Sequence, residues 1–145
     1  MKLNFHFFSL YGKIKLGDFM APIYVKSVYS FLSSTITIDD YINFAKINKL
    51  NNLCLCDDNM YGVMEFIKKC FLNNINPIIG LDINGILLYA KNYSGYVNLL
   101  HLEKIKSERE ITIDDLKKYS SDLVCFIKYD YEFIKRFIKR SRKWL

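Results

Sequence analysis

The amino-acid sequence predicts an α/β protein with mostly parallel strands and flanking helices. Two observations carry this prediction. Short apolar runs rich in β-branched residues recur along the chain, and segments with apolar residues at helical spacing separate most of them. The composition also suits a folded core, because 51% of the residues are hydrophobic and 16% are aromatic, unlike disordered chains. This order of elements is compatible with a doubly wound sheet and with a β/α barrel.

The first part of the chain predicts a strand, a loop and a helix. Residues 23–25 form a short β-prone run, whereas residues 27–37 are rich in hydroxyl side chains and are typical of a loop. Thr37 can accept a hydrogen bond from the first turn of a following helix. Apolar residues at a spacing near 3.6 then predict a helix from Ile38 to about Leu50.

A buried strand and a second helix follow. Residues 53–56 are apolar and lead into Asp57 and Asp58, the pattern of a buried strand that presents carboxylates at its C-terminal end. The helix over residues 63–71 has an apolar face that extends to Phe71, so it should pack on the sheet.

The remaining elements include a hairpin. Residues 77–81 and 86–90 are apolar runs, and Asn84–Gly85 between them predicts a tight turn. The last predicted elements are a helix over about residues 94–104, a short helix over 113–119 capped by Thr112, a strand over 123–127 and a basic amphipathic helix over 130–144.

The net charge of +6 is unevenly distributed. Residues 128–145 carry seven basic and two acidic side chains, whereas the body of the chain is nearly neutral. This pattern argues against a nucleic-acid platform across the domain. We expect the basic face of the helix over residues 130–144 to be solvated; contact with a DNA backbone is the alternative.

The sequence shows no sign of membrane insertion or secretion. No apolar run approaches the roughly 18–20 uncharged residues that span a bilayer. Residues 1–10 lack the apolar core and cleavage site of a signal peptide. We therefore expect a cytoplasmic protein without membrane contact.

The four cysteines lie in apolar segments rather than at the spacing of a disulfide framework. We expect buried structural thiols. Cys54 and Cys56 are expected to face opposite sides of their strand, which disfavours a zinc site.

Four segments in succession carry a specific pattern: residues 24–34 (YVKSVYSFLSS), 53–66 (LCLCDDNMYGVMEF), 75–82 (INPIIGLD) and 87–100 (LLYAKNYSGYVNLL). Together they resemble the PHP (polymerase and histidinol phosphatase) domain at the N-terminus of bacterial DNA polymerase III alpha subunits. The family's segments read His-x-His-Ser-x-Tyr-Ser, Thr-Asp before Met-Tyr-Gly, Pro-Ile-Ile-Gly-x-Glu and Gly-Tyr-x-Asn-Leu. The pattern looks most like that of the short polymerase of low-GC Gram-positive bacteria.

The resemblance implies a seven-stranded, distorted β/α barrel. Residues 20–145 would be an incomplete barrel of this PHP type, and residues 1–19 an upstream extension that packs weakly. In active members, His, Asp and Glu side chains at the strand ends bind metal ions that serve phosphoester hydrolysis. Strand ends in this chain place Lys26, Asp57, Asp58 and Asp82 at the corresponding edge.

The metal ligands that the resemblance implies are mostly missing. Tyr24 and Lys26 stand where the family has its two opening histidines, and a lysine ammonium would repel a metal ion. The residues that would remain as a vestigial metal site are Asp57, Asp58 and Asp82, and the residues expected to line it are Tyr24, Lys26, Ser27 and Asn59. We therefore expect no resident cofactor, with a divalent metal ion as the alternative. Lys26 is expected to pair with Asp57 or Asp82 where a metal once stood.

The resemblance implies a function in DNA replication. The chain would be the PHP module of a DNA polymerase III alpha subunit, with a structural role, a degraded metal site and none of the palm carboxylates that transfer nucleotides. Its partners would be the remaining polymerase domains or replisome subunits, and DNA would be reached through the parent polymerase. The alternatives are a stand-alone, metal-dependent phosphoesterase and the product of a truncated or frameshifted gene.

Overall fold

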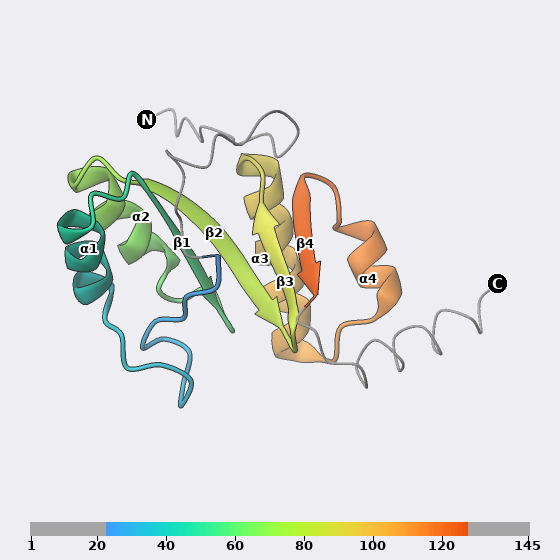
Figure 1. The fold of residues 1–145 in the computed structure, drawn as a ribbon. Coiled ribbons are helices and arrows are strands. Elements are labelled where there is room, and N and C mark those ends of the chain that lie inside the picture. Colours follow the sequence, from blue (N-terminus) through green and yellow to red (C-terminus); the bar gives the residue numbers. More distant parts are fainter. Residues whose placement is uncertain (1–22, 128–145) are drawn as a thin grey trace.

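The computed structural model describes residues 23–127, which form a four-stranded sheet with flanking helices (Figure 1). The elements are α1 (Ile38–Ile47), β1 (Asn52–Asp57), α2 (Val63–Leu72), β2 (Asn76–Ile83), β3 (Ile86–Ala90), α3 (Tyr93–Glu108), α4 (Ile113–Lys118) and β4 (Leu123–Ile127). The predicted extension over residues 1–19 and the predicted basic helix over 130–144 lie outside the described residues. None of the described helices is long and apolar enough to cross a bilayer.

The sheet has the strand order β1-β2-β3-β4 and is mixed. β1 and β2 pair in parallel, whereas β3 pairs antiparallel with both β2 and β4. Consequently β1, β2 and β4 share one direction, as a mostly parallel arrangement requires. The neighbouring pairs are nevertheless mostly antiparallel, because β3 returns through a hairpin and β4 then pairs with β3 rather than with β2.

The hairpin between β2 and β3 confirms the predicted tight turn. Asn84 and Gly85 both have positive φ angles, of 52° and 93°, which a two-residue hairpin turn of the right-handed twist requires. The backbone N–H of Gly85 donates to Oδ1 of Asp82 over 2.8 Å. The turn is therefore fixed to the last residues of β2.

The segment over residues 23–25 does not form the predicted strand. It is tied to the edge of the sheet at β1, where the backbone N–H of Cys56 donates to the carbonyl of Val25 over 2.9 Å. Its other contacts come from side chains, because the hydroxyl of Tyr89 and the thiol of Cys54 both donate to the carbonyl of Ile23. These contacts hold the segment against the sheet without a regular ladder.

Both predicted helix caps are confirmed. The side-chain oxygen of Thr37 accepts from the backbone N–H of Asp40 over 3.1 Å, and Thr112 accepts from Asp115 over 3.3 Å. In each case the Asp side chain accepts in return from the backbone N–H of the threonine, which completes a capping box. The predicted apolar face of α2 is buried except at its end, where the side chain of Phe71 is partly exposed.

The helices pack on one face of the sheet. A single core cluster joins buried residues of α1, α2 and α3 to residues of β1, β2 and β3 (Figure 1). The buried residues of α1 are those of the predicted stripe: Ile38, Tyr41, Ile42 and Ala45. Leu53 and Leu55 of β1 belong to this cluster, and both are fully buried. This packing fixes the strand ends at which the polar side chains gather.

The other face of the sheet carries a second apolar cluster that includes Cys54, Cys56 and Tyr89. The prediction that the two thiols point to opposite faces was wrong, because residues two positions apart on a strand share one face. Burial of Cys54, Cys56 and Cys70 confirms the prediction of structural thiols, whereas Cys125 in β4 is exposed. All four cysteines are free.

Candidate functional site

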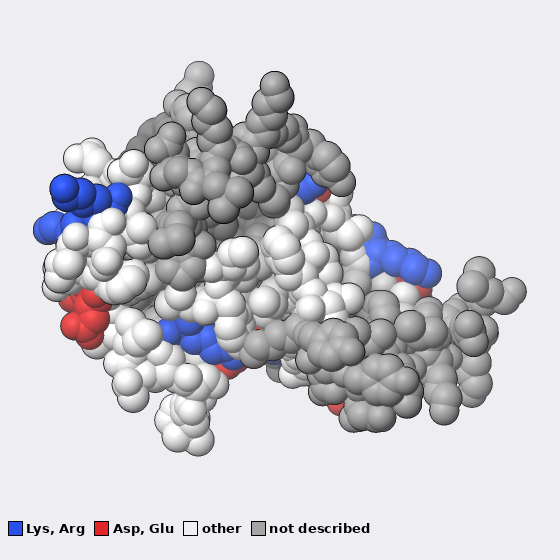
Figure 2. Space-filling view, viewed as in Figure 1, with Lys and Arg blue, Asp and Glu red and all other residues white. Residues whose placement is uncertain are grey.

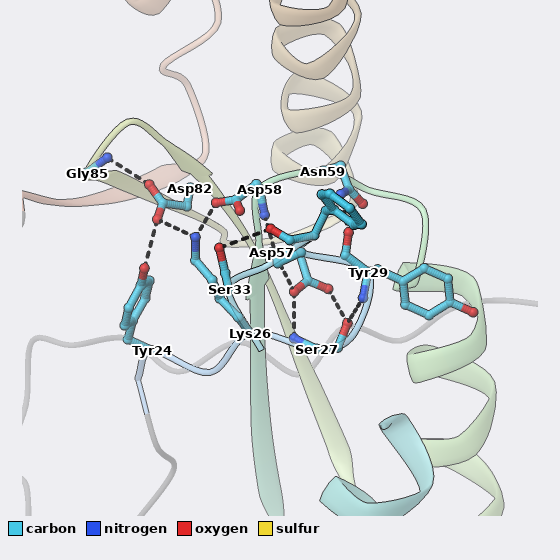
Figure 3. Close-up of polar contacts among 12 residues, drawn as sticks. Tyr24, Lys26, Ser27, Tyr29, Ser33, Asp57, Asp58, Asn59, Asp82 and Gly85 are labelled. Atoms are coloured by element: carbon cyan, nitrogen blue, oxygen red, sulfur yellow. Dashed lines mark hydrogen bonds and ion pairs between the residues drawn. The ribbon is translucent and has the colours of Figure 1, made fainter. Parts of the chain in front are cut away.

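The polar site lies where β1 and β2 end. The two strands are parallel and in register, with Asp57 opposite Leu81, so their C-terminal ends meet at one edge of the sheet. Asp58 follows β1, and Asp82 lies near the end of β2. The segment that precedes the first loop brings Tyr24 and Lys26 to the same edge, as Figure 3 shows.

The ammonium of Lys26 lies between two carboxylates, one just after β1 and one near the end of β2. Its Nζ is 3.2 Å from Oδ2 of Asp82 and also forms an ion pair with Oδ1 of Asp58 (Figure 3). Only 14% of the Lys26 side chain and 6% of the Asp82 side chain are exposed. Burial by itself lowers the pKa of Lys26, but hydrogen bonds and charge attraction from Asp58 and Asp82 outweigh it and raise the pKa. Lys26 is therefore a cation at neutral pH.

Asp82 is held as a carboxylate by several donors. The hydroxyl of Tyr24 donates to its Oδ2 over 2.9 Å, and the backbone N–H of Gly85 donates to its Oδ1. Burial raises the pKa of Asp82, but these two hydrogen bonds and the nearby charge of Lys26 outweigh that effect and lower the pKa. The expected pairing of Lys26 with Asp82 is therefore present in the structure.

The last turns of α3 reach the same edge of the sheet. The ammonium of Lys106 donates to the backbone carbonyls of Asp58 and Asp82. One buried carboxylate oxygen of Glu103 has no hydrogen-bond partner among the described residues, and burial raises the pKa of this group. Sequence reasoning missed Lys106 because it ended this helix at about residue 104. Lys106 could have been assigned to the helix only by extending the predicted helix for one more turn.

Asp57 serves a different purpose from Asp58 and Asp82. It is 1% exposed, and its carboxylate accepts from the backbone N–H of Ser27 over 2.6 Å, from the hydroxyl of Ser27 over 2.6 Å and from the hydroxyl of Ser30 over 2.7 Å. The carboxylate of Asp57 thus anchors the loop that begins at residue 27. Lys26 pairs with Asp58 rather than with Asp57.

The other residues expected to line the site divide between these two groups. Tyr24 joins Lys26 at the two shared carboxylates, whereas Ser27 belongs to the anchor of the loop. Asn59 also supports the loop, because its side-chain amide donates to the carbonyl of Tyr29 over 2.7 Å. The sequence placed all of these residues at the correct edge of the sheet but could not separate the two groups.

The donor set does not suit the divalent metal ions that the family's active members use. Lys26 brings a fixed positive charge to the place between Asp58 and Asp82, and the oxygens of Asp57 already accept three hydrogen bonds. Residues 23–127 contain no group of three or more His, Cys, Asp or Glu side chains arranged to hold a metal ion. The ion pairs at this edge cross-link the segment before the first loop to the ends of β1 and β2.

Comparison with known proteins identifies the family. The model of the PHP domain matches residues 23–137, which is most of the chain. The chain belongs to the PHP domain family. The resemblance read from the four sequence segments is therefore confirmed.

The PHP domain of this chain is similar to part of several curated polymerase subunits. DNA polymerase III subunit alpha of Ureaplasma parvum is 43% identical over 97 residues, which cover 63% of this chain and 10% of the relative. The subunits of the same name from Halalkalibacterium halodurans and Rickettsia prowazekii are 33% and 36% identical and cover 78% and 72% of this chain. The chain spans about a tenth of the length of these relatives.

Proposed function

We propose that this PHP domain is a non-catalytic, structural module of a DNA polymerase III alpha subunit and takes part in DNA replication as part of that polymerase. The observation that carries the structural role is the position of Lys26, whose ammonium lies between Asp58 and Asp82. The similarity to the named polymerase subunits supports the assignment to replication.

The lysine supplies the positive charge that a bound metal ion would otherwise supply. It joins three segments of the chain: the segment before the first loop, the end of β1 and the end of β2. A metal ion can activate a water molecule for attack on a phosphoester, whereas an ammonium that stays protonated has no such Lewis acidity. The site therefore keeps the cross-linking effect of a cation and lacks the hydrolytic one.

The proposal extends to the architecture and to the partners. β1, β2 and β4 share one direction, and helices cover one face of the sheet, which supports an incomplete β/α barrel over residues 20–145. The partners would be the remaining domains of the polymerase or replisome subunits in the cytoplasm, and DNA would be bound by the parent polymerase.

Measurements of metal binding and of phosphoester hydrolysis test whether the domain is non-catalytic. Calorimetric titration with Mn²⁺ or Zn²⁺ should give no saturable micromolar binding, and added Mn²⁺ should elicit neither phosphatase nor 3′–5′ exonuclease activity. A double variant, Tyr24→His with Lys26→His, restores the family's two histidines and is the positive control for metal binding. A stoichiometric micromolar complex of the unaltered chain that is lost in Asp58→Asn and Asp82→Asn would contradict the proposal and favour the stand-alone phosphoesterase.

A chimeric polymerase tests the structural role. Residues 23–127 replace the matching segment of the Ureaplasma parvum subunit, and DNA synthesis and thermal unfolding are measured with and without Lys26→Met. The chimera should synthesise DNA, and Lys26→Met should lower its unfolding temperature while the rate per folded molecule stays the same. A loss of synthesis at a temperature at which the variant is fully folded would contradict a purely structural role.

A further inference from the structure

The loop between residues 28 and 36 presents two apolar side chains to solvent. Phe31 is 84% exposed and Leu32 is 90% exposed, and Val28 and Ile36 at the base of the loop are also exposed. In Figure 1 the loop extends beyond the end of the sheet at which β1 and β2 terminate. Figure 2 shows it as a projection at the bottom of the molecule without charged residues at its tip. We call residues 31 and 32 the apolar tip.

The loop is fixed on one side by the buried carboxylate of Asp57. This carboxylate accepts hydrogen bonds from Ser27 and Ser30, on the approach to the tip. The hydroxyl of Ser30 also accepts from the backbone N–H of Asp58 over 3.0 Å. The backbone N–H of Ser33 donates to the carbonyl of Ser30 over 3.0 Å and closes the turn that carries the tip.

Tyr29, between the two serines that bind Asp57, adds a second anchor for the loop. Its ring lies so close to Gly62 that a Cβ at this glycine would be 2.4 Å from the ring. Its hydroxyl donates to the carboxylate of Glu65 in α2 over 2.6 Å. Together with the hydrogen bond from Asn59 to the carbonyl of Tyr29, these contacts tie the loop to α2 and to the end of β1. An apolar tip that is held in place before binding loses little conformational entropy when it binds.

The absence of charged side chains in the loop indicates which kind of partner it can bind. Residues 27–37 contain no charged side chain. Nucleic acids and anionic membranes are recognised largely through basic residues, which this loop lacks. The cores of protein interfaces are instead depleted of charge and enriched in aromatic residues. A protein surface with an apolar pocket therefore fits the tip best.

We propose that Phe31 and Leu32 insert into an apolar pocket on another domain of the same DNA polymerase III alpha polypeptide. This inference rests on the proposed function. It is supported by the length of the relatives, of which this chain spans about a tenth, so that such a polypeptide has ample further surface to receive the tip. The anchored loop then sets the position of the PHP domain on the rest of the polymerase.

A two-component binding experiment tests this inference. The complete 145-residue chain is titrated into the Ureaplasma parvum subunit from which the matching segment has been removed, and the dissociation constant is measured by calorimetry. The test variant is Phe31→Ser with Leu32→Ser. The matched control is Ile47→Ser with Leu72→Ser, which also removes two exposed apolar side chains but on α1 and α2. Circular dichroism verifies that all three proteins are folded.

The expected result is binding by the unaltered chain, binding weakened about tenfold or more by the loop variant, and no change in the control variant. Hydrogen exchange at the amides of residues 31 and 32 should slow on binding. Equal affinity of the loop variant and the unaltered chain would overturn this inference alone. Absence of binding by the unaltered chain would overturn the proposed function as well. A dimer of the chain by itself that the loop variant makes monomeric would assign the tip to a second copy and overturn the inference.

Discussion

The ammonium of Lys26 lies 3.2 Å from a carboxylate oxygen of Asp82, although 56 positions of sequence separate the two residues. Asp58 completes the group from the end of the neighbouring strand. The pair is largely buried, so neither charge can be fully hydrated once its partner is removed. This relationship makes the electrostatics of the site directly measurable.

Lys26→Met should destabilise the fold, because it leaves two neighbouring carboxylates without their cation. We expect a loss of about 1–3 kcal/mol in the free energy of unfolding, less than for a fully buried pair because Asp58 is partly exposed. Urea denaturation measures the loss. In a double-mutant cycle, Asp82→Asn should recover part of it, and Lys104→Met on the exposed face of α3 serves as the control. Strictly additive effects of Lys26→Met and Asp82→Asn would contradict a direct interaction.

The free energy of unfolding should decrease at acid pH as the carboxylate of Asp82 becomes protonated. The pKa of this carboxyl is lowered in the folded protein from its ordinary value of 3.8. Its contribution is therefore fully present above that value and is lost as the pH falls through the lower pKa of the folded state. Asp82→Asn should make the pH dependence of the unfolding free energy shallower below about pH 4. Asp114→Asn, at an exposed position, is the matched control.

The ion pair of Lys26 and Asp82 should persist at alkaline pH. The pKa of Lys26 is raised in the folded protein above its ordinary value of 10.5. Its contribution is therefore fully present below that value and is lost only as the pH rises through the higher pKa of the folded state. The pair then contributes a constant stability from about pH 5 to pH 10, and a maximum of this contribution near neutrality would contradict the assignment.

Asp57→Asn should loosen the loop that carries the apolar tip. The substitution removes the charge that accepts hydrogen bonds from Ser27 and Ser30, and we expect a loss of about 2 kcal/mol in the free energy of unfolding. Hydrogen exchange should become faster at the amides of residues 28–36, and α1 should remain protected. Unchanged exchange in the loop would mean that Tyr29 alone is sufficient to hold it.

The four thiols should differ in reactivity. Burial raises the pKa of Cys56 and of Cys70 to about 12, and it raises the pKa of Cys54 strongly as well. Cys125 is the exposed one, although burial of part of the side chain also raises its pKa. A thiol reagent at pH 8 should therefore modify Cys125 first and the other three only on unfolding in urea. Cys125→Ser should abolish the fast phase. Fast modification of a second thiol in that variant would contradict the burial.

The sequence by itself determined much of the local structure and the family. Helical spacing gave the buried stripe of α1, capping chemistry gave the starts of α1 and α4, and Asn84–Gly85 gave the hairpin, because each of these depends on residues close together in the chain. The four motifs also identified the PHP domain and placed Lys26, Asp58 and Asp82 at one edge of the sheet. The same motifs predicted neither the length of α3 nor the exposure of Cys125.

Only the tertiary structure decided which charges meet. Asp57 and Asp58 are neighbours in sequence, yet one anchors a loop through serine hydroxyls and the other pairs with Lys26. The two residues have different partners because their side chains point in different directions at the end of β1. The position of the segment over residues 23–26 against the sheet then decides which of them Lys26 reaches. The pairing of β4 with β3 and the contact of Lys106 with the ends of two strands also depend on tertiary packing. These interactions join residues far apart in the chain, so packing of the helices on the sheet, and not local sequence, brings them together.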